Sequence, residues 1–406
     1  MPRTSNVTPT SFERQRGAGA SGSLLYSGAL AQVPRNGGLT WLHLQFLLGL
    51  RRLGWDVLFI DRIDPAICVD ESGAQAPLAE SLNLRYFLRV LKQFGLEDRF
   101  CLLCDGTTRT IGLSRREALE RASSADCLLN VMGYLDDDEI LGRVRRKAFI
   151  DIDPGFGQMW RETGLHDAFN GHDAFVTLGQ NIGRPCCSIP TCGLEWIPTS
   201  YPVVLEHWPL QPQAPDGAYT SLGAWRGANA PVEYKGRTYG QRVHEFRNFV
   251  DVPSRCPGSR FEMALEIHPA DVKDRHALRE HGWSVVDPKA VAGGPIEYRA
   301  YIAQSKAEFM VPKQMYVATN SGLLSDRSAY YLASGRPVLA RDTGLEHVYP
   351  VGEGLLTFTT AEEAAASVDA INADYPRHAR AARALAEEHL DSDVVLSRLL
   401  VKLGLA

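Results

Sequence analysis

The chain of 406 residues contains no long apolar run, although a helix that spans a membrane needs about 20 consecutive apolar residues. Its first 23 residues are rich in Arg, Ser, Thr, Pro and Gly and include no apolar segment, so a secretory signal is not expected. We therefore expect a cytoplasmic protein without a transmembrane segment, and we interpret residues 1–22 as a flexible N-terminal tail.

An excess of positive charge is also missing, since 43 Lys and Arg face 48 Asp and Glu for a net charge of −5. This balance leaves no excess of basic residues of the kind that binds nucleic acid, so we expect no nucleic-acid partner. Among the eight cysteines, Cys101-x-x-Cys104 is half of a zinc knuckle, but no second short pair follows at a suitable spacing. We expect free thiols and no metal site.

No Walker A sequence occurs, so one common glycine signature of nucleotide binding is absent. The first half instead alternates buried strands and helices. An apolar run at 23–28 leads through Asn36-Gly37-Gly38 to an apolar helix at 39–53 and a strand at 56–61, which predicts a βαβ unit. Further buried strands are expected at 127–132, 147–153 and 174–179, which makes this half a parallel α/β domain.

Five prolines between positions 198 and 215 form the clearest linker signal, so we place a domain boundary near 205–216. Strands and helices then alternate again from 218–223 to a helix at 361–373, which predicts a second Rossmann-like sheet. The expected domains are residues 23–206, residues 207–375, and C-terminal helices over 376–406 that could pack back on the first domain.

The segment 320–373 carries the most specific pattern. Asp326-Arg327-Ser328 opens a helix, Ala333-Ser334-Gly335-Arg336-Pro337-Val338 turns from helix to strand, and Gly352-Glu353-Gly354-Leu355-Leu356 precedes another strand. This order resembles the donor-binding half of the GT-B superfamily of glycosyltransferases. The resemblance implies an α/β fold with two Rossmann-like domains facing a cleft. It also implies transfer of a hexosyl group from a nucleotide-diphosphate sugar to a hydroxyl of a small molecule or glycan, with no metal or other cofactor.

Three residues are candidates for catalysis under this resemblance: Asp153, Arg226 and Lys313. Negative charge develops on the departing diphosphate, and Arg226 and Lys313 supply cations to stabilise it. Asp153 ends a strand, where it could act as a general base or simply cap the turn at Pro154. Asp151-x-Asp153 could hold a metal in a different glycosyltransferase fold, which this plan does not match. The rival bases are His43, His172 and His268.

The predicted donor-binding residues share a place in glycine-containing loops or at helix N-termini, where backbone N–H groups can bind phosphate. They are Gly37, Gly38, Gly223, His268, Ser325, Asp326, Arg327, Ser328 and Gly344. Asp326 and Ser328 are expected to contact donor hydroxyls or phosphate, although both could also serve only to cap the helix.

One departure from the family leaves the reaction open. Retaining members carry a Glu-x7-Glu pair, and alignment on Gly335-Arg336-Pro337 places those positions at Gly322 and Tyr330, neither of which is acidic. The alternatives are a UDP-sugar epimerase of the same fold and a non-catalytic binding or scaffold protein. The oligomeric state is also left open.

Overall fold

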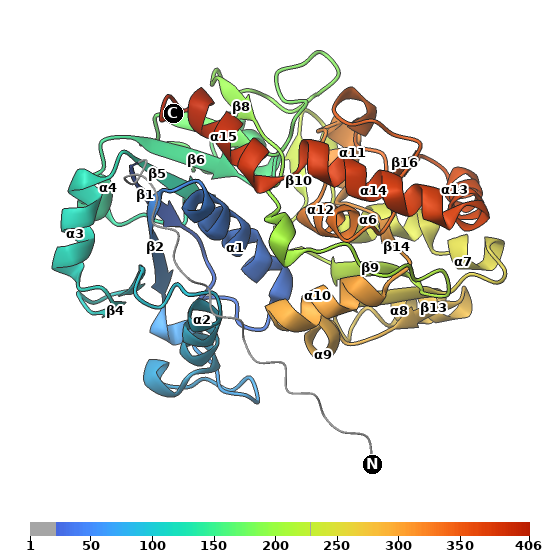
Figure 1. Ribbon diagram of the computed structural model, residues 1–406, viewed down its shortest axis with the longest axis horizontal. Helices are drawn as coiled ribbons and strands as arrows, with labels where there is room; N and C mark the ends of the chain where they lie inside the picture. The colour runs from blue at the N-terminus through green and yellow to red at the C-terminus, as the bar shows by residue number, and fades with distance from the viewer. Residues whose placement is uncertain (1–21, 228) are drawn as a thin grey trace.

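The computed structural model describes residues 22–227 and 229–406. The segment interpreted as a flexible tail therefore lies almost entirely outside the described residues. Two parallel sheets lie side by side, each covered by helices, with the first half of the chain in blue to green and the second in yellow to red (Figure 1). The chain is thus α/β, and it has the two Rossmann-like units that the sequence predicted.

The first sheet has eight strands in the order β4-β3-β2-β1-β5-β6-β7-β8. Apart from β4, which pairs antiparallel with β3, all neighbouring strands in it are parallel. Its six middle strands follow the 3-2-1-4-5-6 order of a Rossmann sheet. The strands are β1 (Ser23–Ser27), β2 (Asp56–Ile63), β3 (Phe100–Cys104), β4 (Thr110–Gly112), β5 (Cys127–Val131), β6 (Lys147–Asp151), β7 (Ala174–Thr177) and β8 (Trp196–Pro198).

The helix between β1 and β2 is almost entirely buried, as its apolar sequence predicted. Asn36 caps its N-terminus, because the Asn36 side chain accepts a hydrogen bond from the N–H of Leu39 at 3.0 Å. The helices and 3-10 turns of this half are α1 (Gly37–Arg52), η1 (Pro65–Ile67), η2 (Leu78–Glu80), α2 (Leu82–Gln93), α3 (Arg115–Ser124), α4 (Asp138–Leu141), α5 (Phe156–Glu162) and η3 (Leu205–His207).

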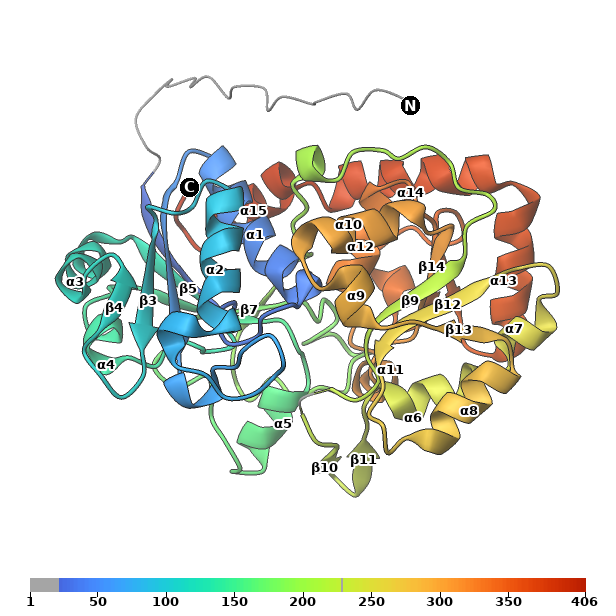
Figure 2. The same cartoon turned by 90° about the horizontal axis from the view of Figure 1, so that it is seen from below.

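The second sheet has six parallel strands in the order β13-β12-β9-β14-β15-β16, again 3-2-1-4-5-6 along the chain. A separate antiparallel hairpin, β10–β11, lies beside α5 of the first half (Figure 2). The strands are β9 (Tyr219–Ala224), β10 (Val232–Tyr234), β11 (Arg237–Tyr239), β12 (Phe261–Glu266), β13 (Trp283–Val285), β14 (Ala307–Met310), β15 (Val338–Arg341) and β16 (Leu355–Phe358).

Helices of the second half follow the predicted alternation closely, and the helix expected at 361–373 has those bounds. The helices and 3-10 turns are α6 (Arg242–Phe246), η4 (Arg247–Phe249), α7 (Val252–Arg255), α8 (Val272–Glu280), α9 (Pro288–Ala292), α10 (Pro295–Gln304), α11 (Gln314–Thr319), α12 (Asp326–Ala333), η5 (Leu345–His347), α13 (Ala361–Ala373), α14 (Tyr375–His389) and α15 (Ser392–Lys402). Among the described residues, no helix combines the length and the apolar character that crossing a membrane would require.

The two halves share a packed interface. The buried Trp41 of α1 donates to the carbonyl of Pro295 at 2.8 Å and packs against Trp208, whose ring stacks on Tyr330 of α12 at 4.5 Å. The last helix, α15, lies on α1 of the first half (Figure 1). The N–H of Val203 donates to Leu390, and Ser392 donates back to Val203.

Candidate active site

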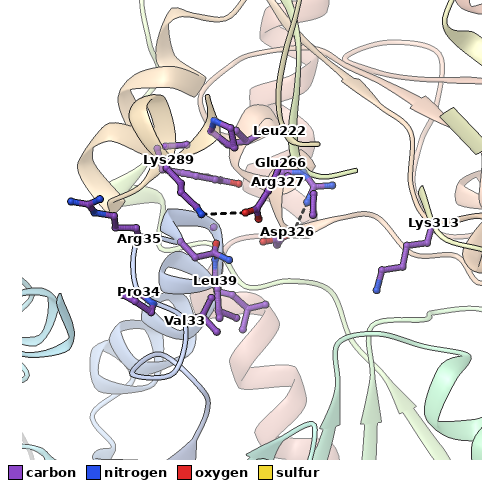
Figure 3. Close-up of a pocket in the computed structure, with 18 residues that line it drawn as sticks. Val33, Pro34, Arg35, Leu39, Leu222, Glu266, Lys289, Lys313, Asp326 and Arg327 are labelled. Carbon is purple, nitrogen blue, oxygen red and sulfur yellow. Dashed lines mark hydrogen bonds and ion pairs between the residues drawn. The ribbon is translucent and has the colours of Figure 1, made fainter. Parts of the chain in front are cut away.

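A cavity of about 630 Å³ opens between the two halves, at the carboxyl ends of the parallel strands (Figure 3). Its volume falls in the range of small-molecule sites, and strand ends are where open α/β sheets bind ligands. A second cavity of about 210 Å³ shares four wall residues with it: Leu42, Lys313, Asp326 and Arg327. We call these the outer cavity and the inner cavity.

Two glycines at the end of β9 and just after it let two cations approach the cavities. A side chain at Gly223, whose φ is +135°, would meet the Arg242 guanidinium at 2.8 Å. A side chain at Gly227 would meet the Lys313 stem at 3.2 Å. Arg242 is buried, donates to the carbonyl of Leu222 at 3.0 Å, and has its pKa lowered by burial. The loop glycines thus make room for charged side chains of this chain itself.

The N-terminus of α12 faces both cavities. Ser325 is its N-cap and accepts a hydrogen bond from the N–H of Ser328 at 3.2 Å. Asp326 and Arg327 follow and point toward the outer cavity (Figure 3). Burial raises the pKa of the Asp326 carboxyl, while the neighbouring Arg327 lowers it.

Arg327 is a mostly buried cation without a hydrogen-bonded partner for its Nε among the described residues. Its side chain is 16% exposed, and its nearest carboxylates, on Glu308 and Asp326, lie at 3.7 and 3.8 Å. A buried guanidinium whose nearest carboxylates lie beyond hydrogen-bond distance is only partly neutralised. Because Arg327 lines both cavities, its charge is well placed to receive an anion there.

Glu308 lies beneath this helix end and was not predicted from the sequence. It is 1% exposed on β14 and accepts a hydrogen bond from the Ser328 hydroxyl at 2.5 Å. Burial raises its pKa to about 7, against the opposing effects of Arg327 and Ser328. The sequence could have indicated Glu308 by its position inside an apolar strand, because a carboxylate there needs a buried partner.

Asp153 and Lys313, predicted from separate halves, come together in the structure. The Lys313 ammonium lies 2.5 Å from Asp153 Oδ2, and both side chains are about one-fifth exposed. Asp153 also accepts hydrogen bonds from the Tyr316 hydroxyl and, at 3.0 Å, from Asn229. Burial and the adjacent carboxylate raise the pKa of Tyr316 well above its usual value.

The N-terminus of α1 supplies the opposite wall. Gly38 lines the outer cavity, and Gly37 packs so closely on the second half that a side chain would meet the carbonyl oxygens of Ala292 and Gly294 at 2.6 Å. The hydroxyl of Tyr298, another wall residue, is buried without a hydrogen-bond partner among the described residues. The Tyr298 hydroxyl thus adds an unused hydrogen-bonding group to the site.

Five predicted site residues line neither cavity: Gly37, Arg226, His268, Ser328 and Gly344. Arg226 points outward and forms a bidentate pair with Asp271 at 2.7 and 3.0 Å. His268 lies beyond the end of β12, which stops at Glu266, and is exposed. Gly344 begins a 3-10 turn of three residues, and its N–H donates to Asp342 at 2.9 Å. Its expected role as a phosphate-binding helix end is therefore not supported by this geometry.

Ser328 also differs from expectation, since it is fully buried and its hydroxyl donates to Glu308.

Two of the rival bases make contacts away from the cavities. His43 is fully buried against Tyr26, where burial lowers its pKa to about 3, and His172 contacts Asn130 in the first half. Asp151 accepts hydrogen bonds from its neighbours inside the first half.

The cysteine pattern does not form a cluster. Cys101 and Cys104 are buried on β3, and their odd spacing places them on opposite faces of the strand. Within residues 22–227 and 229–406, no group of three or more His, Cys, Asp or Glu side chains could hold a metal ion.

No model of a known protein family matches the chain, and no curated protein matches its sequence. Solved structures do match its fold along nearly the whole length. An alpha-glucosyltransferase in complex with UDP-glucose and DNA containing an abasic site matches with a TM-score of 0.58 at 12% identity, over 93% of this chain and 98% of that chain. Anabaena Alr3699/HepE in complex with UDP-glucose matches with a TM-score of 0.56 at 12% identity, over 94% and 99% of the two chains. The chain therefore has the GT-B fold that its segment 320–373 predicted.

Proposed function

We propose that this protein is a glycosyltransferase that moves a hexosyl group from a uridine-diphosphate sugar to an acceptor hydroxyl. The observation that carries the proposal is the mostly buried Arg327 guanidinium, which lines a cavity between two Rossmann-like sheets and whose nearest carboxylates lie 3.7 and 3.8 Å away. Arginine binds phosphate through a planar fork, and the N-terminal end of α12 adds a favourable dipole. The UDP-glucose bound in both matching structures supports uridine diphosphate as the nucleotide of the donor.

The charges around the cavities suit a diphosphate. The outer and inner cavities are walled by five cations, Arg35, Arg242, Lys289, Lys313 and Arg327, and by three carboxylates. The excess of two positive charges would balance the two negative charges of a sugar diphosphate. These side chains could stabilise the leaving group as its bond to the sugar breaks, without requiring a metal.

Glu266 would bind the ribose. It ends β12, the second strand of the second sheet, and Lys289 holds its carboxylate at 3.2 Å (Figure 3). An acidic residue near this place contacts ribose hydroxyls in dinucleotide-binding Rossmann folds. The sugar would then extend toward Lys313 and the inner cavity.

A small molecule or glycan remains our proposed acceptor, because the net charge of −5 does not favour a polyanion. The DNA bound to one matching structure makes nucleic acid the natural comparison, so an acceptor screen should include both classes.

The test compares Arg327→Gln with a matched control, Arg226→Gln, whose arginine is exposed and paired outside the cavity. Calorimetry should show UDP binding to the wild type and the control. Arg327→Gln should bind UDP about 10- to 100-fold more weakly, as expected for losing hydrogen bonds to a charged ligand. UDP release from UDP-glucose, with and without chelator, then measures turnover and its metal requirement.

Three other results would point elsewhere. Equal UDP affinity in both variants would refute the assignment of Arg327. Binding without turnover toward any acceptor would favour the non-catalytic scaffold, and interconversion of UDP-sugars without release of UDP would favour an epimerase.

A further inference from the structure

The ion pair of Asp153 and Lys313 stands where the outer and inner cavities meet. Lys313 belongs to the wall of both cavities, whereas Asp153 lines only the inner one. Lys313 follows β14 in the second half and Asp153 follows β6 in the first, so the pair joins the two halves. The pair therefore lies at the border between the two cavities.

The carboxylate of Asp153 accepts three hydrogen bonds. One oxygen accepts from the Tyr316 hydroxyl, and the other accepts from Lys313 and Asn229. All three donors come from the second half. Three of about four acceptor sites of the carboxylate are therefore used for contacts within the protein, which favours a positioning role over that of a general base.

The Lys313 ammonium donates a hydrogen bond to Asp153 and lies over the rings of Phe156 and Tyr316, at 4.8 and 5.7 Å from their centroids. Its stem passes beside Gly227, which has no side chain. A lysine carries a point charge on a flexible stem, and its three donors can turn from one anion to another. Arg327 lines the same outer cavity, and its guanidinium is only loosely paired with Glu308 and Asp326, at 3.7 and 3.8 Å.

We propose that Lys313 exchanges Asp153 for the donor diphosphate, so that Asp153 is a positioning residue that competes with the donor for this lysine. The inference rests on the proposed function. In the free protein, Asp153 neutralises Lys313 and holds it at the border of the cavities. When the diphosphate enters, the ammonium turns toward it, and Asp153 keeps its hydrogen bonds to Tyr316 and Asn229. No covalent step is involved.

Calorimetric titration of the full chain with UDP and with uridine tests the exchange. Asp153→Asn keeps the size of the side chain but removes the competing charge, so UDP should bind about tenfold more tightly, the scale of one charge-assisted hydrogen bond. Uridine has no phosphate, so its affinity should stay unchanged, and this also shows that the variant is folded. Lys313→Met should weaken UDP binding about tenfold, and adding Asp153→Asn to it should have no further effect on UDP affinity.

Two results would overturn the exchange alone. Unchanged UDP affinity with lost turnover in Asp153→Asn would make Asp153 the general base. Weaker UDP binding in that variant would mean that Asp153 only holds Lys313 in place. Failure of the wild type to bind any nucleoside diphosphate would overturn the proposed function itself, and it is recognised before any variant is measured.

Discussion

Replacing the buried Glu308 by glutamine should remove much of the pH dependence of stability in the second half. Glu308 is 1% exposed, so its charged form loses hydration on folding. Burial raises its pKa from 4.5 to about 7 even though Arg327 and Ser328 favour the charged form. A raised carboxyl pKa means that the folded state holds the proton more tightly than the unfolded state. Stability is therefore highest at low pH and falls as the pH rises from the unfolded value to the folded value.

The size of the effect follows from this difference. The folded pKa of about 7 against the unfolded value of 4.5 corresponds to about 3 kcal/mol, and most of this free energy should be lost between pH 5 and pH 8. Glutamine has nearly the same shape and can still accept the Ser328 hydroxyl through its carbonyl oxygen, but it cannot ionise. The variant should gain stability over the wild type at pH 8 by roughly that amount more than at pH 5.

Urea unfolding of the wild type and Glu308→Gln at both pH values measures this gain. Glu266→Gln is the matched control, because the Glu266 side chain is 63% exposed. A difference between variant and wild type that is the same at pH 5 and pH 8 would refute the reasoning. It would mean that Arg327 already compensates the Glu308 charge in full.

Three further changes can be measured by unfolding and UDP titration. Gly223→Ala should weaken UDP binding several-fold, because the added methyl group would lie 2.8 Å from the Arg242 guanidinium and displace it. Unchanged UDP affinity would count against this close packing. Asn181→Ala removes the side chain that bridges the halves to the carbonyl of Gly344 at 3.1 Å, and should cost about 1 to 3 kcal/mol of stability in urea. Trp208→Ala should cost about 3 to 5 kcal/mol, because its fully buried ring stacks on Tyr330; a loss below about 1 kcal/mol would contradict this packing.

Much of the fold was predictable because its signals are local. An apolar run that ends in glycine marked the first strand, and the helices expected at 39–53 and 361–373 are found at Gly37–Arg52 and Ala361–Ala373. The order of the strands was not predicted, since strand pairing depends on contacts between residues far apart in the chain.

The site was predicted less well, because a loop residue and a cavity residue can have the same sequence context. Arg226 and Arg327 both follow strands of the second half, but Asp271 holds Arg226 outside the cavity and α12 holds Arg327 inside it. Glu308 was missed because its partner Ser328 was expected to face the donor. Which of these side chains points inward depends on helix packing and not on spacing along the chain.

The place of α15 has a consequence for how the chain acquires its structure during synthesis. A side chain at Gly49 of α1 would meet Leu396 at 2.5 Å, so the glycine and the last helix fit directly together. A ribosome delivers α1 first and α15 more than three hundred residues later, so the apolar face of α1 stays uncovered while the whole second half emerges. The first half of the protein is therefore the last to be finished, and the nascent chain must keep that face from aggregating until the end of translation.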